Sequence, residues 1–412
     1  MKFLVKFLKQ HTVSPSTGAH FDFLDGVRGI AILLVVMCHA VYCNPNAGPA
    51  IRFITQVTGA GTVGVPIFFV LSGFVIFYPF YKLREKDARA WIVPGYASRR
   101  IFKIAPPFLL SFVLLSGLYL LQFRDVSYIK QGLQWFVGLP NLSLPIFAEN
   151  RFNAPLWSLV VEVQFYLVLP FLVLATRGLS ARQTSYTIGA LLIVVPMAIR
   201  FLTWPVSNDP QMSVLAERRF PCDLDYFGWG VLFCGIFVSP AYCAEERKCW
   251  VRAGYVGLFG VVPTMLLIAC IMPMMDGHTL LRAEFYHGLA GIVAFLILFL
   301  IFAPTCLAVR FLSSPLLRFT GLISYEWYLL HEPVIFFARW WWGSAHANAL
   351  RYMVILGVPV VFTFLVAAAI YHFYSLPILK WGRSRLSAKR PIGEPKAGTP
   401  AAEILCAKKR LE

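Results

Sequence analysis

Residues 156–175 read LWSLVVEVQFYLVLPFLVLA, an apolar run of twenty residues that contains one charged side chain, that of Glu162. At about 1.5 Å per residue, a helix of this length crosses the roughly 30 Å hydrocarbon core of a bilayer. The whole chain shares this composition, because 58% of its 412 residues are hydrophobic and only 14% are charged. Soluble domains are about 45–50% apolar and about 25% charged. The chain is therefore predicted to be a polytopic membrane protein, which excludes a secreted disulfide scaffold and a nucleic-acid-binding domain.

Similar stretches recur along the chain and predict an all-α fold of about ten transmembrane helices. The predicted spans cover approximately residues 26–43, 62–81, 104–123, 156–175, 184–203, 224–239, 251–272, 286–305, 321–342 and 350–373. With the N-terminus inside, 27 of the 37 Lys and Arg residues fall on the cytoplasmic side. This bias predicts that both termini are cytoplasmic. An additional span at 128–139 would place one terminus outside, and that alternative stays open.

The two ends of the chain differ from the spans between them. Residues 1–20 begin with MKFLVKFLKQ, whose alternating basic and apolar positions predict an amphipathic helix on the cytoplasmic membrane surface. Residues 376–412 are rich in Lys, Arg, Pro and Ala and are predicted to be a disordered cytoplasmic tail. The transmembrane domain is expected to occupy residues 21–375. The nine Cys residues have no metal-ligand spacing, so no metal site is predicted.

Ionisable side chains within the first span are functional candidates, because inserting a charged residue at the centre of a transmembrane helix costs about 2.5–3.5 kcal/mol. Residues 24–40 read LDGVRGIAILLVVMCHA, in which Arg28 and His39 are 11 positions apart. This spacing is about 16.5 Å and slightly more than three helical turns. The two side chains therefore share a face, with Arg28 near the cytoplasmic edge and His39 in the outer half. The alternative is that Arg28 extends to the interface and His39 is a packing residue.

Two other spans carry ionisable groups at a similar depth. Glu162 falls in the outer half of its span, and His331 falls near the middle of the span over 321–342. Tyr325 and Tyr328 lie on the cytoplasmic side of His331. Three such groups from three helices predict a polar cavity, although structural hydrogen bonding between helices would produce the same pattern.

The loop after the second span is strongly basic. It carries seven cations within 22 residues, which are Lys82, Arg84, Lys86, Arg89, Arg99, Arg100 and Lys103. A cluster of this kind is typical of an anchor to anionic lipids. It is equally suited to a polyanionic soluble ligand such as a nucleotide cofactor, and the composition leaves both interpretations open.

Five ordered motifs between about residues 22 and 335 resemble acyltransferase family 3, the integral-membrane enzymes that acylate bacterial surface sugars. They are Asp25-Gly-x-Arg28-Gly with His39, Gly64 to Phe74 with Ser72, Arg99-Arg100-x-x-Lys103, Trp157-Ser158-x3-Glu162, and Tyr325-x-x-Tyr328-x-x-His331. Lys103 departs from the family, whose basic motif has a second Arg at this position. Lysine keeps the charge but lacks the bidentate fork that suits phosphate.

The resemblance implies a reaction and a cellular location. The donor would be cytoplasmic acyl-CoA, usually acetyl-CoA, and no cofactor would be permanently bound. The acceptor would be a hydroxyl of a cell-surface glycan or glycolipid at the bacterial inner membrane. The chain is expected to be the stand-alone form without a periplasmic esterase-like domain, so any periplasmic partner would act in trans. A polytopic transporter or flippase, whose buried ionisable groups carry ions or protons, is the alternative function.

The motifs also suggest a role for each candidate residue. His39 is predicted to be the general base, and Glu162 would hold its imidazole in position. The predicted ligands of the donor phosphates are Arg28, Arg99, Arg100 and Lys103. A pantetheine arm of about 15–20 Å matches the separation of Arg28 and His39. The cavity would be lined by Asp25, Ser72, Trp157, Ser158, Tyr325, Tyr328 and His331. Direct transfer and a covalent acyl-enzyme both remain open.

Overall fold

The computed structural model describes residues 22–40, 58–136, 153–204, 218, 221–238, 252, 255, 259–260, 263, 279–302, 306–342 and 349–388. Every regular element in these ranges is helical. The helices before residue 204 are α2 (Asp22–Ala40), η1 (Ala60–Val63), α4 (Gly64–Lys86), α5 (Tyr96–Phe123), α6 (Ser127–Phe136), α8 (Leu156–Ala175) and α9 (Ala181–Thr203). Those after it are α11 (Leu224–Val238), α13 (Thr279–Phe302), α14 (Leu307–Leu312), α15 (Pro315–Leu322), α16 (Ser324–Trp342), α17 (Ala349–Ile370), η4 (Tyr371–Ser375) and α18 (Leu376–Ala388).

Six described helices are long and apolar enough to cross a membrane. They are Asp22–Ala40, Gly61–Lys86, Tyr96–Phe123, Leu156–Ala175, Ala181–Thr203 and Gly357–Arg385. The all-α membrane fold is thus confirmed for the described residues, whereas the count of about ten spans and the orientation stay predictions. Helix α16 is also apolar but carries three charged side chains, Glu326, Glu332 and Arg339. Residues 1–20 and most of 251–272 lie outside the described residues.

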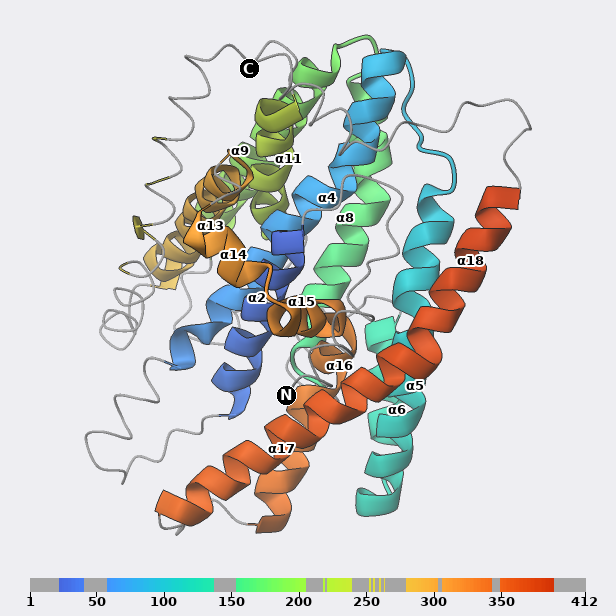
Figure 1. The fold of residues 1–412 in the computed structure, drawn as a ribbon, viewed down its shortest axis with the longest axis vertical. Helices are drawn as coiled ribbons and strands as arrows, with labels where there is room; N and C mark the ends of the chain where they lie inside the picture. Colours follow the sequence, from blue (N-terminus) through green and yellow to red (C-terminus); the bar gives the residue numbers. More distant parts are fainter. Residues whose placement is uncertain are drawn as a thin grey trace.

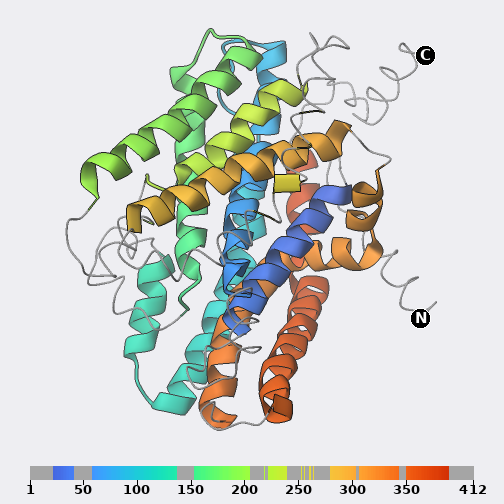
Figure 2. The ribbon, with the colours of Figure 1, turned by 90° about the vertical axis from the view of Figure 1, so that its left-hand side faces the viewer.

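Helix α2 lies in the middle of the bundle, against α4, α15 and α16 (Figures 1 and 2). Glycine makes the closest contacts between backbones here, as is common between membrane helices. A Cβ atom added to Gly321 would lie 1.8 Å from the carbonyl oxygen of Asp25. On the other side, a Cβ on Gly73 would lie 2.2 Å from the carbonyl oxygen of Phe227. These contacts fix α15 against α2 and α11 against α4, and so position the two motifs that contain Asp25 and Ser72.

The last two helices form one continuous rod across one face of the molecule, shown in red in Figure 1. A five-residue π-helix, Tyr371–Ser375, joins α17 to α18. The sequence prediction of a disordered tail from residue 376 is therefore wrong for Leu376–Ala388, which are helical. The reason is packing, because the ring of Trp381 lies edge-on to that of Phe102 in α5, with 5.6 Å between centroids. Residues 389–412 lie outside the described residues.

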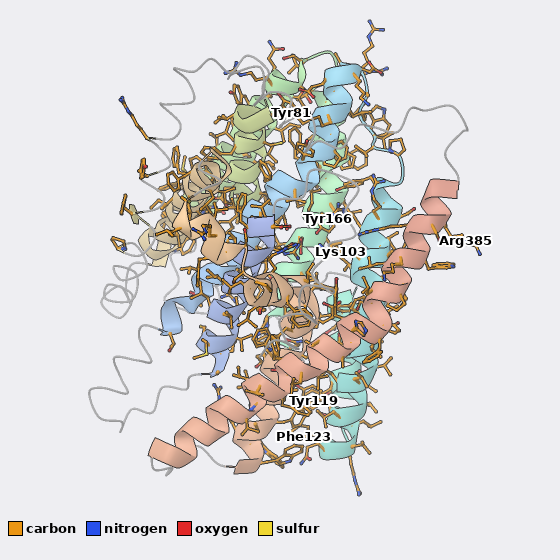
Figure 3. All side chains as sticks on the ribbon, in the orientation of Figure 1. Tyr81, Lys103, Tyr119, Phe123, Tyr166 and Arg385 are labelled. Atoms are coloured by element: carbon orange, nitrogen blue, oxygen red, sulfur yellow. The ribbon has the colours of Figure 1, made fainter. Side chains whose placement is uncertain are left out.

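An aromatic cluster joins the ends of α5, α6 and α16. Tyr119 and Phe123, labelled in Figure 3, stack on Tyr128 with centroid distances of 4.4 and 5.4 Å. The side chains of Trp340 and Trp341 are 53% and 56% exposed, a composition typical of the membrane–water interface. His331 precedes Trp340 by nine residues, or about 13.5 Å along the helix, and its position near mid-membrane stays a prediction.

Helix α6 occupies most of the 128–139 stretch whose embedding the sequence left open. It begins after Asp125, whose carboxylate accepts hydrogen bonds from the Ser127 backbone N–H at 2.8 Å and from the Ser127 hydroxyl at 2.6 Å. These two donors stabilise the ionised form and hold the pKa of this carboxyl below its ordinary value. This helix packs against α5 and α8 at the aromatic cluster.

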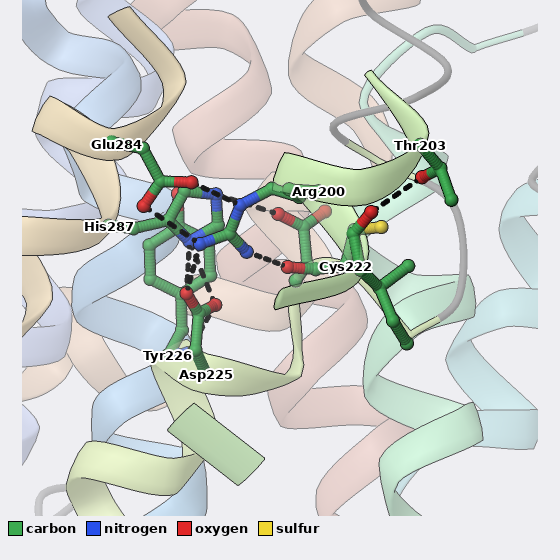
Figure 4. A network of polar contacts seen from close by, with 9 residues as sticks. Arg200, Thr203, Cys222, Asp225, Tyr226, Glu284 and His287 are labelled. Atoms are coloured by element: carbon green, nitrogen blue, oxygen red, sulfur yellow. Dashed lines mark hydrogen bonds and ion pairs between the residues drawn. The ribbon is translucent and has the colours of Figure 1, made fainter. Parts of the chain in front are cut away.

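A buried ionic network joins α9, α11 and α13 (Figure 4). The Arg200 guanidinium, 1% exposed, donates to the two carboxylate oxygens of Glu284 at 2.8 and 3.1 Å and to Asp225 at 2.9 Å. It also donates to the carbonyl oxygen of Cys222. Nδ1 of His287 lies 2.8 Å from Oδ1 of Asp225. Each helix therefore contributes at least one charge to the same network.

Removing the Arg200 guanidinium should destabilise the packing of α9, α11 and α13. The variant Arg200→Met leaves the buried Asp225 and the half-buried Glu284 without their cation, and breaking a buried pair costs about 3–5 kcal/mol. Thermal unfolding in detergent, followed by intrinsic fluorescence, should show a lower midpoint than that of wild type. The matched control is Arg177→Met, because Arg177 is exposed. Equal midpoints for the two variants would show that the network contributes no stability.

Candidate active site

Two histidines from different helices meet in the interior. Nδ1 of His39 in α2 lies 2.8 Å from the carbonyl oxygen of Val35, and Nε2 of His331 in α16 lies 3.4 Å from the same Nδ1. The rings are edge-on, with 5.0 Å between centroids. His331 is fully buried and His39 is half-buried. The structure thus brings together two residues that are 292 positions apart.

The backbone carbonyls define how these imidazoles are protonated. A carbonyl oxygen only accepts hydrogen bonds, so Nδ1 of His39 must carry the hydrogen that it donates to Val35. Nδ1 of His331 lies 2.8 Å from the carbonyl oxygen of Tyr328 and must carry a hydrogen for the same reason. In the neutral form, each Nε2 then holds a lone pair. Nε2 of His39 makes no hydrogen bond within the described residues, so this lone pair can take up a proton.

Two arginines lie near His39, and one of them also packs on a tryptophan. The Arg339 guanidinium donates to the carbonyl oxygens of His39 and Ala40, the second at 2.8 Å, and so holds the end of α2. Arg218 lies over the ring of Trp157, 4.4 Å from its centroid. Both guanidinium charges act on the His39 imidazole. Of the predicted cavity residues, Trp157 thus lies next to Arg218, whose charge acts on the candidate base.

Glu162 makes its hydrogen bonds away from His39. The Ser72 hydroxyl donates to Oε1 of Glu162 at 2.8 Å, and the Tyr166 hydroxyl donates to the same oxygen. Glu162 also interacts electrostatically with Lys103. The sequence predicts that this carboxylate holds the His39 imidazole, but its hydrogen bonds go to Ser72 and Tyr166. Val35 and His331 contact Nδ1 of His39 instead.

The hydroxyls of the predicted cavity tyrosines bind backbone carbonyls of neighbouring helices and loops. Tyr325 donates to Ile104 in α5 at 3.0 Å. Tyr328 donates to Pro155 at 2.6 Å, and its oxygen also lies 2.6 Å from the Ser158 hydroxyl at the start of α8. These bonds attach α16 to α5 and α8. Because α16 also carries His331, they set the position of that imidazole relative to His39.

Three predicted donor-binding cations converge at the other end of α2. The charges of Arg28 and Arg100 act on the Lys103 ammonium, together with those of Glu162 and Asp25. Figure 3 shows Lys103 in the middle of the molecule, near Tyr166. The Arg100 guanidinium lies 5.6 Å from the Tyr166 ring centroid.

Within the described residues, the Nε atoms of Arg28 and Arg100 are buried without a hydrogen-bond partner. The Glu162 and Asp25 carboxylates also act on Lys103 and offset part of the positive charge of this cluster. Arg99 is not among the charges that act on Lys103. The arrangement can therefore accept a multiply charged anion between α2 and α5.

Several buried charges were missed in the sequence analysis. Glu326 is 4% exposed and interacts electrostatically with Arg28 and Lys103. Arg339, Arg218 and the Arg200 network were missed as well. Glu326, Arg339 and Arg200 fall inside predicted apolar spans, so the rule that identified Glu162 could have found them. Arg218 lies in a polar connection and gave no such signal.

The comparisons with known proteins agree with this arrangement. A family model described as an acyltransferase domain matches residues 21–374. The chain is 25% identical over 386 residues to the O-acetyltransferase OatA of Staphylococcus aureus, an alignment that covers 87% of this chain and 57% of OatA. It is 28% identical over 375 residues to the acyltransferase MdmB of Streptomyces mycarofaciens, covering 82% of this chain and 87% of MdmB. The chain thus spans little more than half the length of OatA. No solved structure matches it.

Proposed function

This chain belongs to the acyltransferase family whose domain model covers residues 21–374, and on that premise we propose that it moves an acyl group from acyl-CoA to a hydroxyl of a glycan or glycolipid. The acyl group that we favour is acetyl, since OatA is named an O-acetyltransferase. The observation that carries the proposal is that α2 holds two functional side chains, one near each end. One end of this helix holds Arg28, whose Nε atom is buried without a hydrogen-bond partner among the described residues, and the other holds an imidazole with an available Nε2.

The cation cluster suits the phosphates of coenzyme A. Arg28, Arg100 and Lys103 offer several N–H donors to phosphate oxygens, and charge-assisted hydrogen bonds of this kind are among the strongest in proteins. His39 follows Arg28 by 11 residues, about 16.5 Å along the helix. An extended pantetheine arm of about 15–20 Å would bring the thioester from the cluster to the imidazole.

His39 acts as the general base in the proposed reaction. Its Nε2 takes the proton of the acceptor hydroxyl while the oxygen attacks the thioester carbonyl carbon. The C–O bond forms and the C–S bond breaks, and the imidazolium then returns the proton to the leaving sulfur. The products are an ester and free coenzyme A, so the reaction needs no other reactant.

The proposed setting is the inner membrane of a bacterium, with both termini in the cytoplasm. In this orientation the start of α2, and with it Arg28, faces the cytoplasm, where acyl-CoA is made. His39 would then lie in the outer half of the membrane, where an acceptor on the outer face can reach it. The acceptor is carried by lipid or by a surface polymer, and any further periplasmic protein acts as a separate partner.

Labelled donor in membrane vesicles tests this function. Inside-out vesicles, which expose the cytoplasmic face, are incubated with acetyl-CoA labelled in the acetyl group. Vesicles that contain the protein should release free coenzyme A and gain alkali-labile label in their lipid or glycan fraction. Control vesicles without the protein should do neither. If the protein neither binds nor consumes acetyl-CoA or longer acyl-CoAs, the basic cluster anchors lipid and the proposal is wrong.

A further inference from the structure

We infer that His331 is a positioning residue that acts through His39, by accepting a hydrogen bond from the imidazolium that forms when His39 takes up a proton. The inference rests on the proposed function, because it assigns the histidine pair to the same reaction. It gives an imidazole the place that a carboxylate occupies in a serine-protease-type triad. Glu162, which the sequence pointed to for this place, bonds Ser72 and Tyr166 instead.

The protonation state of His331 is set by α16 itself. Nδ1 lies 2.8 Å from the carbonyl oxygen of Tyr328 and 3.2 Å from that of Trp327, both within the preceding turn. Both partners are acceptors, so the ring hydrogen sits on Nδ1 and the lone pair on Nε2. His331 is fully buried, so these contacts are shielded from bulk solvent. The lone pair therefore points at its neighbour as a fixed acceptor.

His39 presents the matching donor. Its Nδ1–H lies between the carbonyl oxygen of Val35 at 2.8 Å and Nε2 of His331 at 3.4 Å. The 3.4 Å contact is long for a neutral ring. Protonation at Nε2 strengthens the donor at Nδ1, because hydrogen bonds from charged donors are shorter and stronger than neutral ones. The pair is thus arranged to gain interaction energy as the base becomes charged.

The surrounding charges make such an acceptor necessary. Arg339 and Arg218 both act on His39 and oppose a further positive charge. No carboxylate contacts its ring within the described residues. The charge that acts on His331 is that of His39 itself. Among the described residues, Val35 and His331 are therefore the two groups that contact Nδ1 of the imidazolium, and of these His331 is the one whose contact is made by a side chain.

The test compares His331→Phe, which removes the acceptor, with His331→Gln, whose amide oxygen can replace it. The matched control is His372→Phe, which changes a histidine in the π-helix far from the pair in sequence. With acetyl-CoA as donor, His331→Phe should lower kcat about tenfold and leave donor affinity unchanged. The acidic limb of its pH–rate profile should move to lower pH, because the protonated form of His39 has lost a stabilising partner. The acidic limb of the pH–rate profile of His331→Gln should stay at the wild-type pH, and this variant should lose less activity than His331→Phe.

The outcomes separate this inference from the proposed function. If wild type depends on His39 but His331→Phe matches His372→Phe in both rate and limb, the function stands and the role of His331 is refuted. A lower rate with an unmoved limb in both His331 variants would indicate a purely structural residue and also refute it. If wild type turns over no acyl-CoA, the proposed function itself fails. Should the Phe variant not fold, ¹⁵N NMR of histidine-labelled wild type decides, since the inference requires hydrogen on Nδ1 of both rings.

Discussion

His39→Ala is expected to lower acyl transfer from acetyl-CoA by about 10²–10⁴-fold, the usual contribution of a general base. The variant removes the only imidazole of the pair whose Nε2 lone pair is available for a proton, since Nε2 of His331 points at His39. The alanine leaves the cation cluster untouched, because Arg28 lies 11 residues earlier on α2. Donor affinity should therefore remain at the wild-type value while the rate falls.

The measurement pairs release of coenzyme A with equilibrium binding of acetyl-CoA to the purified protein. His372→Ala is the matched control and should behave as wild type. Glu162→Gln should lose less activity than His39→Ala, because the Glu162 carboxylate bonds Ser72 and Tyr166 and not the base. Equal and complete loss in both variants would make Glu162 a direct participant. A fully active His39→Ala variant would contradict the assignment of the base.

Arg28→Ala and Arg100→Ala should each weaken acetyl-CoA binding by about 10–100-fold. A hydrogen bond to a charged group contributes about 1.5–3 kcal/mol, and every 1.4 kcal/mol is tenfold in affinity. The Nε atoms of both guanidinium groups lack a hydrogen-bond partner within the described residues, so a phosphate can bond them without displacing an existing contact. The double variant should lose more than either single one, since both cations would contact the same phosphates.

The measurement compares the affinity of detergent-solubilised protein for acetyl-CoA with its affinity for acetyl-pantetheine. Acetyl-pantetheine, which lacks the nucleotide and its phosphates, should bind wild type and both variants equally. Arg89→Ala is the matched control, because Arg89 belongs to the same basic loop but is exposed. If Arg89→Ala weakens acetyl-CoA binding as much as Arg28→Ala does, the loop attracts anions only through its overall charge and carries no defined phosphate site.

The sequence predicts the helices well because apolar length is a local property. The span predicted over 156–175 coincides with α8, Leu156–Ala175, and the one over 184–203 begins three residues inside α9. The prediction fails at Leu376, where the chain becomes basic but the helix continues. Trp381 holds it there by packing on Phe102, and a contact between residues so far apart leaves no trace in local composition.

The sequence predicts which residues belong to the candidate site, but it does not predict which of them contact each other. The free energy needed to place an ionisable side chain inside the membrane is enough to identify His39, Glu162 and His331, because each one lies in an apolar run. Which of them meet depends on helix rotation and tilt, and these follow from close packing such as that of Gly321 on Asp25. The sequence therefore paired His39 with the carboxylate, whereas the fold pairs it with the second imidazole.

One donor molecule is expected to span α2 from the cation cluster to the base. A cryo-electron microscopy structure with a non-hydrolysable acetyl-CoA analogue tests it most directly. The account predicts phosphates within hydrogen-bonding distance of Arg28, Arg100 and Lys103, and the acetyl carbonyl carbon close enough to Nε2 of His39 for one hydroxyl group to fit between them. Phosphates bound elsewhere, or an acetyl group that ends far from His39, would contradict the account.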